Sequence, residues 1–404
     1  MKQRLVVIGN GMAGMRTVEE LLLSAPDKYD ITVFGAEPYG NYNRIMLSSV
    51  LCGEKTIEDI VINSRQWYVD NNIRLHAGKH KAVIRIDRAA RKVYAQDGTC
   101  AGYDRLLIAT GSKAVIPPIP GNDLEGVISF RDIFDVNRML AYSRSHKKAV
   151  VLGGGLLGLE AANGLVLRGM DVTVIHNNEV LLNRQMDRQA GEMLRTALEQ
   201  RGLKFKMAAR TQRLISDGND HIKAVRFEDG SELECDLFIM AIGVRPNIVL
   251  AREAGLYCER GIVVNDTLQS YDPSIYAVGE CIQHRGDTFG LVAPLFEQAK
   301  VCANHLSDHG VAEYSTLPAA TKLKVTGINL FSVGDFLGDG SCESIYFTDP
   351  ALGIYKKLVI KANKLIGAVL YGDTADGNWY QELLEKEEPV SGIRDALIFG
   401  RAYV

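Results

Sequence analysis

Two glycine-rich turns, each directly after an apolar run, constrain this chain more than any other feature of its sequence. The first is Gly9-x-Gly11-x-x-Gly14 after residues 5–8, and the second is Gly153-x-Gly155-x-x-Gly158 after residues 149–152. The first glycine of such a turn allows the tight bend, the second lets the backbone approach a pyrophosphate, and the third lets a helix pack on the strand. Backbone N–H groups and the positive end of the helix dipole then stabilise the anion. Two such turns predict two dinucleotide-binding units.

The residues after the first turn fit a dinucleotide. A helical stretch at 15–24 and a predicted strand at 31–34 are followed by Glu37. An acid about 20 residues after the last glycine is the expected partner of a ribose 2′-hydroxyl. Glu37 is therefore predicted to bind the ribose of the first dinucleotide.

The second turn differs at the corresponding position. A helical stretch at 159–168 and a strand at 172–175 lead to His176, which stands where the acid is expected. No Arg follows within three residues to hold a 2′-phosphate, and Glu179 would repel one, so NADH is favoured over NADPH. A neutral His176 could still bond a ribose hydroxyl, whereas a protonated one could attract a phosphate. An unliganded loop histidine is an equal alternative.

Length and charge exclude several classes of protein. A chain of 404 residues is too long for one core and predicts two or three domains. The net charge of −3 gives no basic footprint for nucleic acid. No apolar run reaches the length of about 18 residues that a membrane span needs, and the N-terminus does not read as a signal peptide. The seven cysteines form no local pair, so no metal site or redox disulfide is expected, and the predicted location is the cytoplasm.

The order of the elements predicts three domains. Two strand-and-small-turn endings, at 103–111 and 237–243, mirror each other and indicate two copies of one architecture. Three prolines at 117–120 mark a crossing between them. The predicted domains are 1–115 with 244–312, then 116–243, then a small α+β domain at 313–404.

These pieces in this order resemble the flavoprotein disulfide reductase superfamily, which implies glutathione-reductase-like, α/β, Rossmann-like domains for FAD and NAD plus a small C-terminal domain. Within it, the chain resembles the FAD/NADH portion of assimilatory nitrite reductase large subunits and the electron-transfer subunits of assimilatory nitrate reductases. That narrower resemblance is carried by the runs at 42–48, 278–286 and 290–299, with support from 323–327 and 367–373.

The resemblance implies roles for single residues. Gly279 and Glu280 would lie beside the ribityl chain and phosphate, and the helix that begins near Pro294 would point its N-terminus at the flavin. Arg44 would bind the pyrophosphate, with a surface carboxylate as its alternative partner. Glu160 would orient the nicotinamide amide. The complete expected FAD set is Gly9, Gly11, Met12, Ala13, Gly14, Glu37, Arg44, Ser48, Ala109, Thr110, Gly111, Gly279, Glu280, Pro294 and Leu295. The nicotinamide set is Gly153, Gly155, Leu156, Leu157, Gly158, Glu160, His176 and Gly243.

One departure from the family pattern bears on the chemistry. Related enzymes carry a redox Cys or a Lys just after the position of Ser48, whereas this chain has Ser49, and Cys52 comes three residues late. Ser49 is assigned to the catalytic set with Glu160. A cysteine-based peroxidase or thiol reductase is disfavoured.

The expected function is an FAD-dependent NAD(P)H dehydrogenase. It would take a hydride from NADH and pass single electrons to an iron–sulfur partner, either a nitrate or nitrite reductase catalytic subunit or a small electron carrier. A stand-alone NADH oxidase or a rubredoxin/ferredoxin reductase is the first alternative. A sensing or assembly module without turnover is the second, and for it the C-terminal domain could form a docking or homodimer surface.

Overall fold

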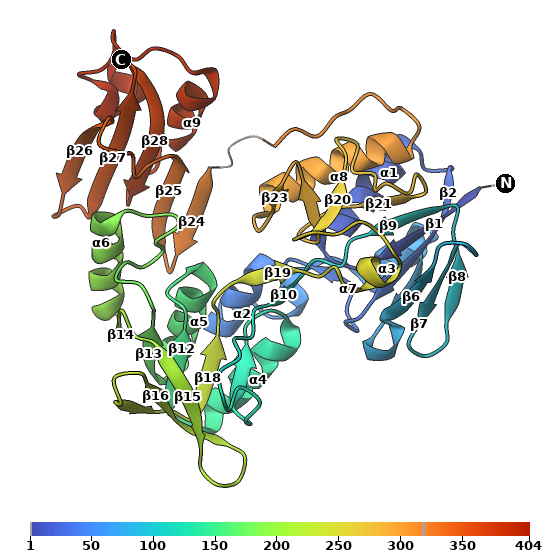
Figure 1. Ribbon diagram of the computed structural model, residues 1–404, viewed down its shortest axis with the longest axis horizontal. Coiled ribbons are helices and arrows are strands. Elements are labelled where there is room, and N and C mark those ends of the chain that lie inside the picture. The colour runs from blue at the N-terminus through green and yellow to red at the C-terminus, as the bar shows by residue number, and fades with distance from the viewer. Residues whose placement is uncertain (1, 317–319) are drawn as a thin grey trace. The chain divides into compact units, whose positions relative to one another are not determined.

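The computed structural model describes residues 2–316 and 320–404, and the chain divides into two compact units (Figure 1). The first unit consists of Met1–Leu47, Lys55–Ala114 and Val244–Thr316. The second consists of Ser48–Glu54, Val115–Gly243 and Leu317–Val404. The chain therefore leaves the first unit and later returns to it. The three predicted domains, 1–115 with 244–312, 116–243 and 313–404, stay a prediction.

A five-stranded parallel sheet forms the centre of the first unit. Val7 in its central strand pairs with Val33 on one side and Leu107 on the other, and all three side chains are buried. Continuous apolar runs are typical of parallel strands that are covered on both faces. The strand order is β21 (Ile275–Ala277), β9 (Arg105–Ile108), β1 (Gln3–Ile8), β2 (Tyr29–Gly35) and β5 (Arg74–Ala77). Helices α1 (Met12–Ser24) and α8 (Val292–Leu306) lie side by side in this unit (Figure 1).

Smaller elements complete the first unit. They are the meander β6 (Val83–Asp87), β7 (Lys92–Ala95) and β8 (Cys100–Gly102); the pairs β3 (Asn41–Tyr42) with β4 (Val61–Asn63) and β10 (Ser112–Ala114) with β19 (Val244–Pro246); the sheet β20 (Ile262–Val264), β22 (Ile282–His284) and β23 (Asp287–Thr288); and helices α3 (Arg65–Asp70) and α7 (Val249–Glu253).

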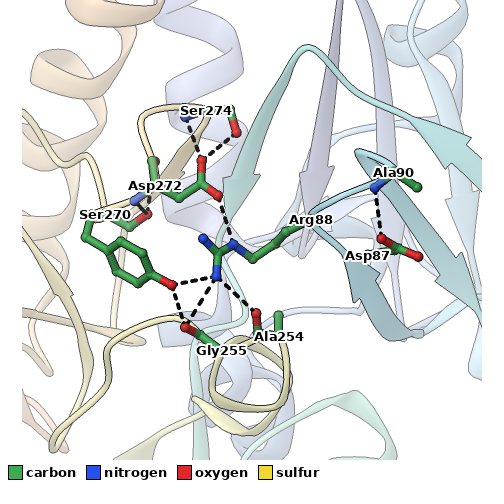
Figure 2. A network of polar contacts seen from close by, with 9 residues as sticks. Asp87, Arg88, Ala90, Ala254, Gly255, Ser270, Asp272 and Ser274 are labelled. Carbon is green, nitrogen blue, oxygen red and sulfur yellow. Dashed lines mark hydrogen bonds and ion pairs between the residues drawn. The ribbon is translucent and has the colours of Figure 1, made fainter.

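Arg88, at the end of β6, connects parts of the first unit that are far apart in sequence (Figure 2). Its Nε donates to Asp272 Oδ2 over 2.8 Å, and its Nη1 contacts both the Gly255 carbonyl and the Tyr271 hydroxyl. The guanidinium also lies over the Tyr271 ring, 4.9 Å from its centre. Although burial alone would raise the pKa of Asp272, hydrogen bonds from Ser274 and Arg88 hold it below its ordinary value. Arg88 therefore connects the β6–β8 meander to the segment Val244–Thr316, with which the chain returns to this unit.

The second unit contains another five-stranded parallel sheet. Its order is β11 (Val127–Ser129), β18 (Leu237–Met240), β12 (Lys148–Leu152), β13 (Asp171–Ile175) and β14 (Lys204–Lys206). Its helices are α4 (Ile133–Ser145), α5 (Leu156–Leu167) and α6 (Arg188–Glu199). A meander of β15 (Thr211–Ser216), β16 (Ile222–Phe227) and β17 (Glu232–Glu234) shares a buried core with the strands of the sheet. Most of the short helix α2 (Leu47–Cys52) also belongs to this unit.

The C-terminal part of the second unit is an antiparallel sheet with one helix. The strand order is β24 (Thr321–Val325), β25 (Ile328–Gly334), β28 (Lys364–Tyr371), β27 (Ile354–Lys361) and β26 (Glu343–Asp349). Helix α9 (Gly377–Lys386) covers one face, where Phe331, Leu358 and Tyr380 share a buried core. Together with the two parallel sheets, this confirms the predicted α/β class with two Rossmann-like folds and a small α+β part. Within the described residues, every helix is too short or too polar to cross a bilayer.

Candidate functional site

The first glycine turn joins β1 to α1 with space for a ligand beside its middle glycine. Gly9 has a φ of +112°, and a Cβ there would lie 2.1 Å from the Ala109 carbonyl oxygen. A Cβ on Gly14 would lie 2.8 Å from the Ala109 side chain, whereas one on Gly11 would meet nothing within 4 Å. Gly11 is also the N-cap of α1 and makes no side-chain cap, so the first N–H groups of the helix lack intrahelical partners. This turn fits a pyrophosphate.

The returning stretch of chain reaches the same turn. A Cβ on Gly279 would lie 3.0 Å from the side chain of Ala13, in the first turn of α1. The neighbouring Glu280 accepts a hydrogen bond from Ser112 Oγ over 2.7 Å. The Gly279 N–H donates to Oε1 of Gln298, a fully buried residue of α8. The structure thus brings Gly279 and its neighbour Glu280 to the first glycine turn.

Ala109, Thr110 and Gly111 follow β9 at the carboxyl edge of the same sheet. Ala109 contacts the glycine turn, and the Thr110 hydroxyl donates to the Asn247 carbonyl over 2.7 Å. Gly111 accepts from the Asn247 N–H over 2.9 Å. The contacts with Asn247 hold this segment at the carboxyl ends of the strands, where open α/β sheets bind their ligands.

Glu37 and Arg44 contact each other. Arg44 donates to Glu37 Oε1 over 2.6 Å, the Tyr42 hydroxyl donates to Oε2 over 2.7 Å, and the guanidinium lies 5.1 Å from the centre of the Tyr42 ring. Glu37 follows β2, where a ribose hydroxyl would lie. Each carboxylate oxygen keeps a further lone pair for such a hydroxyl. The sequence analysis assigned Glu37 to a ribose and Arg44 to the pyrophosphate, and the structure gives Arg44 a carboxylate partner, Glu37.

Helix α8 begins at Val292, so Pro294 and Leu295 both lie in its first turns. Proline is tolerated there because the N–H groups of the first turn have no intrahelical acceptor. The N-cap residue, Leu291, makes no side-chain cap. The helix therefore offers uncapped N–H groups at its positive end.

The second glycine turn repeats the geometry of the first between β12 and α5. A Cβ on Gly153 would lie 2.3 Å from the Ala241 carbonyl oxygen, and a Cβ on Gly158 would lie 2.0 Å from the Gly153 carbonyl oxygen. One on Gly155 would meet nothing within 4 Å. Leu156 and Leu157 open α5, and Gly243, with a φ of +119°, also has open space around its Cα. This turn fits a second pyrophosphate.

His176 forms a hydrogen bond with the second turn. Its Nδ1 accepts the Gly154 N–H over 3.2 Å, which places the ring proton of the neutral form on Nε2. That Nε2 is buried and has no hydrogen-bond partner within the described part of the chain. Burial lowers the pKa of His176 below its ordinary value, against the opposing effects of the nearby Asn183 side chain and Val180 backbone. The ring is therefore a neutral donor.

Glu160 is the one carboxyl of the second turn whose protonation is strongly perturbed. Desolvation raises its pKa to about 7, and a hydrogen bond with the Ser48 hydroxyl opposes the shift. Ser48 and the predicted Ser49 are neighbours on α2, and it is Ser48 that meets Glu160. Cys52 lies on the same helix, 3.9 Å from the Asn163 amide, and burial raises the pKa of its thiol. A thiol with a raised pKa is a poor nucleophile.

Two groups of residues escaped prediction. Gln298 lies within the characteristic run at 290–299, yet only its buried hydrogen bond to Gly279 reveals a role. Arg168 donates to the carbonyls of Leu51 and Val50 at the end of α2, over 2.7 and 3.2 Å. No sequence pattern indicates this contact, because the partners are more than a hundred positions apart.

Comparisons with known proteins agree with this geometry. Residues 3–305 match the family Pyridine nucleotide-disulphide oxidoreductase, and residues 319–388 match the Rubredoxin NAD+ reductase C-terminal domain. The NAD(P)H nitrite reductase of Bacillus subtilis (strain 168) is 47% identical over 390 residues, which cover 96% of this chain and 48% of that protein. The assimilatory nitrate reductase electron transfer subunit of the same organism is 44% identical over 397 residues, which cover 98% of this chain and 51% of that protein.

Among solved structures, NADH:rubredoxin oxidoreductase from Clostridium acetobutylicum has a TM-score of 0.82 at 25% identity and covers 99% of both chains. The chain spans about half the length of the two curated relatives above. The family match extends over both dinucleotide-binding folds. The chain belongs to the pyridine nucleotide-disulphide oxidoreductase family, as an oxidoreductase that uses FAD and NAD(P)H.

Proposed function

We propose that this chain is an NADH dehydrogenase module that delivers electrons to an iron–sulfur centre of a nitrate or nitrite reductase. The observation that carries the proposal is the similarity to the nitrite reductase and to the nitrate reductase electron transfer subunit along almost the whole chain. Bound FAD would supply the exchange between two-electron and one-electron transfer. A cytoplasmic location belongs to the same proposal.

We assign a different nucleotide to each of the two glycine turns. We assign FAD to the first turn, where Glu37 would bind its ribose and the Gly279–Glu280 turn its ribityl chain and phosphate. The helix dipole of α8 would favour negative charge at its N-terminus. The nicotinamide nucleotide is assigned to the second turn, with Glu160 positioning the carboxamide and His176 donating to the adenosine ribose. NADH is preferred because a neutral histidine offers no charge to a 2′-phosphate.

The environment of Cys52 supports an external acceptor. Cys52 has a raised pKa and contacts Asn163, and Ser48 rather than a cysteine or lysine meets Glu160. Electrons would then leave for a partner protein rather than for a protein disulfide. A rubredoxin reductase is a second candidate, favoured by the match of residues 319–388 to the rubredoxin reductase C-terminal domain.

An acceptor panel tests the proposal. FAD-loaded protein would be mixed with NADH or NADPH, and its visible flavin absorbance followed. Oxidised ferricyanide, rubredoxin, oxygen and the catalytic subunit of a nitrate or nitrite reductase would then be compared as acceptors. We expect rapid bleaching by NADH and fast reoxidation by the reductase subunit. Failure of both NADH and NADPH to bleach the flavin would exclude any dehydrogenase, and faster turnover with rubredoxin than with the reductase would favour the second candidate.

A further inference from the structure

Asp187 is a buried carboxylate that serves both halves of the second unit. It is the N-cap of α6, where Oδ1 accepts the Ala190 N–H over 3.1 Å. Its Oδ2 accepts the hydroxyl of Tyr355, on β27 of the C-terminal sheet, over 2.6 Å. Lys357 Nζ lies 4.0 Å from the same oxygen. Each of these three side chains is at least nine-tenths buried, so the contact is a strong one.

The rest of α6 meets the same sheet. Near its start, Gln189 donates to Thr348 Oγ1 over 3.3 Å, and just past its end Arg201 donates to Thr326 Oγ1 over 2.7 Å. Helix α9 and its buried core occupy the opposite face of the sheet. The C-terminal sheet therefore contacts α6 at both ends, and Asp187 is the buried point of this contact.

The segment before Asp187 leads directly back to the second glycine turn. Gly154 donates its N–H to His176 Nδ1 and accepts the Leu182 N–H over 3.0 Å, so both ends of the 176–182 loop are tied to one residue of the turn. The Met186 N–H then donates to the Leu182 carbonyl over 2.8 Å. Asp187 follows at once. A short, hydrogen-bonded path thus joins the adenosine side of the turn to Tyr355.

We propose that Tyr355 and Lys357 are positioning residues for NADH: by holding Asp187, they fix the 177–187 loop against the second glycine turn. This inference rests on the proposed function, which assigns that turn to the nicotinamide nucleotide. The C-terminal part then contributes to nucleotide affinity without touching the nucleotide. Burial raises the pKa of Tyr355 well above its ordinary value, and the Asp187 carboxylate raises it further. The Tyr355 hydroxyl therefore keeps its proton and stays a donor.

The test compares two buried tyrosines that lie on opposite faces of the C-terminal sheet. Tyr355→Phe removes the hydroxyl that Asp187 accepts, and Tyr380→Phe removes a buried hydroxyl that donates to the Leu397 carbonyl over 2.8 Å on the other face. FAD content, kcat and KM for NADH would be measured with ferricyanide. We expect Tyr355→Phe to raise KM about 3- to 10-fold with kcat and FAD content unchanged, and Tyr380→Phe to leave KM unchanged.

A truncated hydride donor separates positioning from general loosening. N-benzyl dihydronicotinamide carries the reacting ring but no adenosine, so Tyr355→Phe should bleach the flavin with it at the wild-type rate. Asp187→Asn should raise KM for NADH as well, and combining it with Tyr355→Phe should add little.

Three outcomes would overturn the inference: equal KM values in Tyr355→Phe and Tyr380→Phe, an equal loss of rate with the truncated donor, or additive effects of Asp187→Asn and Tyr355→Phe. Failure of the wild-type protein to be bleached by NADH would instead overturn the proposed function.

Discussion

Glu160 keeps its proton at a pH where an exposed glutamate has lost it. Because folding raises its pKa from 4.5 to about 7, the folded state binds the proton more tightly than the unfolded chain does. Stability therefore falls as pH rises through this window, and the loss is complete above the folded pKa. The free energy of unfolding of Glu160→Gln is compared with that of the wild-type protein at each pH. We expect this difference to be about 2–3 kcal/mol more favourable to the variant at pH 8 than at pH 5.

Urea unfolding of the FAD-loaded protein at the two pH values measures this difference. Glu253→Gln is the matched control, since Glu253 is exposed on α7. The same change in both variants between pH 5 and pH 8 would show that the Glu160 carboxyl is not the group that titrates.

His176 should make the choice of nucleotide insensitive to pH. The Gly154 N–H occupies Nδ1 and burial lowers the pKa of the ring, so it stays neutral at neutral pH and cannot attract a 2′-phosphate. We expect the ratio of kcat/KM for NADH over NADPH to stay constant between about pH 6.5 and 8. His176→Arg should lower this ratio at least about tenfold, because guanidinium binds phosphate well.

Steady-state rates with ferricyanide would check both parts, with the exposed His80→Arg as control. A steep rise in kcat/KM for NADPH toward lower pH in the wild-type protein would mean that the His176 ring becomes protonated, which would contradict the expected neutral ring.

At the scale of elements, the contact between α2 and α5 decides where Ser48 lies. A Cβ on Gly164 of α5 would come within 2.7 Å of Leu51 Cγ on α2, so the two helices meet at a glycine. Gly164→Ala should therefore destabilise the protein by about 1–3 kcal/mol, although alanine favours a helix by about 1 kcal/mol. Leu51→Ala should relieve the clash, and the double variant should be more stable than the two single effects predict. Additive effects on urea unfolding would contradict this packing.

Element prediction from the sequence succeeded where the signal is local. The strands at 5–8 and 149–152 and the helices after them follow from the glycine turns, but the helices begin three residues earlier than predicted because Gly11 and Gly155 are their N-caps. The Ser48–Glu160 and Asp187–Tyr355 contacts could not be predicted. Each depends on the packing of segments more than a hundred residues apart, which no spacing in the sequence records.

At the scale of the whole molecule, the first unit is built from segments that are separated in sequence by inserted stretches of chain. It is assembled from three segments, and the last of them carries Gly279 and Glu280 back to the first glycine turn. The returning segment is fastened at its far side by Arg88, which binds Asp272 and the Gly255 carbonyl (Figure 2). Retention of FAD and the Arg88 contacts should therefore be linked.

Arg88→Met tests this link, because methionine keeps an apolar stem and removes the charge and its donors. Asp272 would then be a partly buried carboxylate without its cation, and we expect a loss of about 2–3 kcal/mol in the free energy of unfolding. FAD should also be released at a lower temperature, which flavin fluorescence during heating would detect. Arg85→Met is the control. Arg85 lies on β6, three residues before Arg88, is exposed, and contacts Asp87 and Tyr94 of the same meander. Release of FAD at the same temperature in both variants would mean that the returning segment is held at the turn by other contacts, and that Arg88 serves only the local packing of the meander.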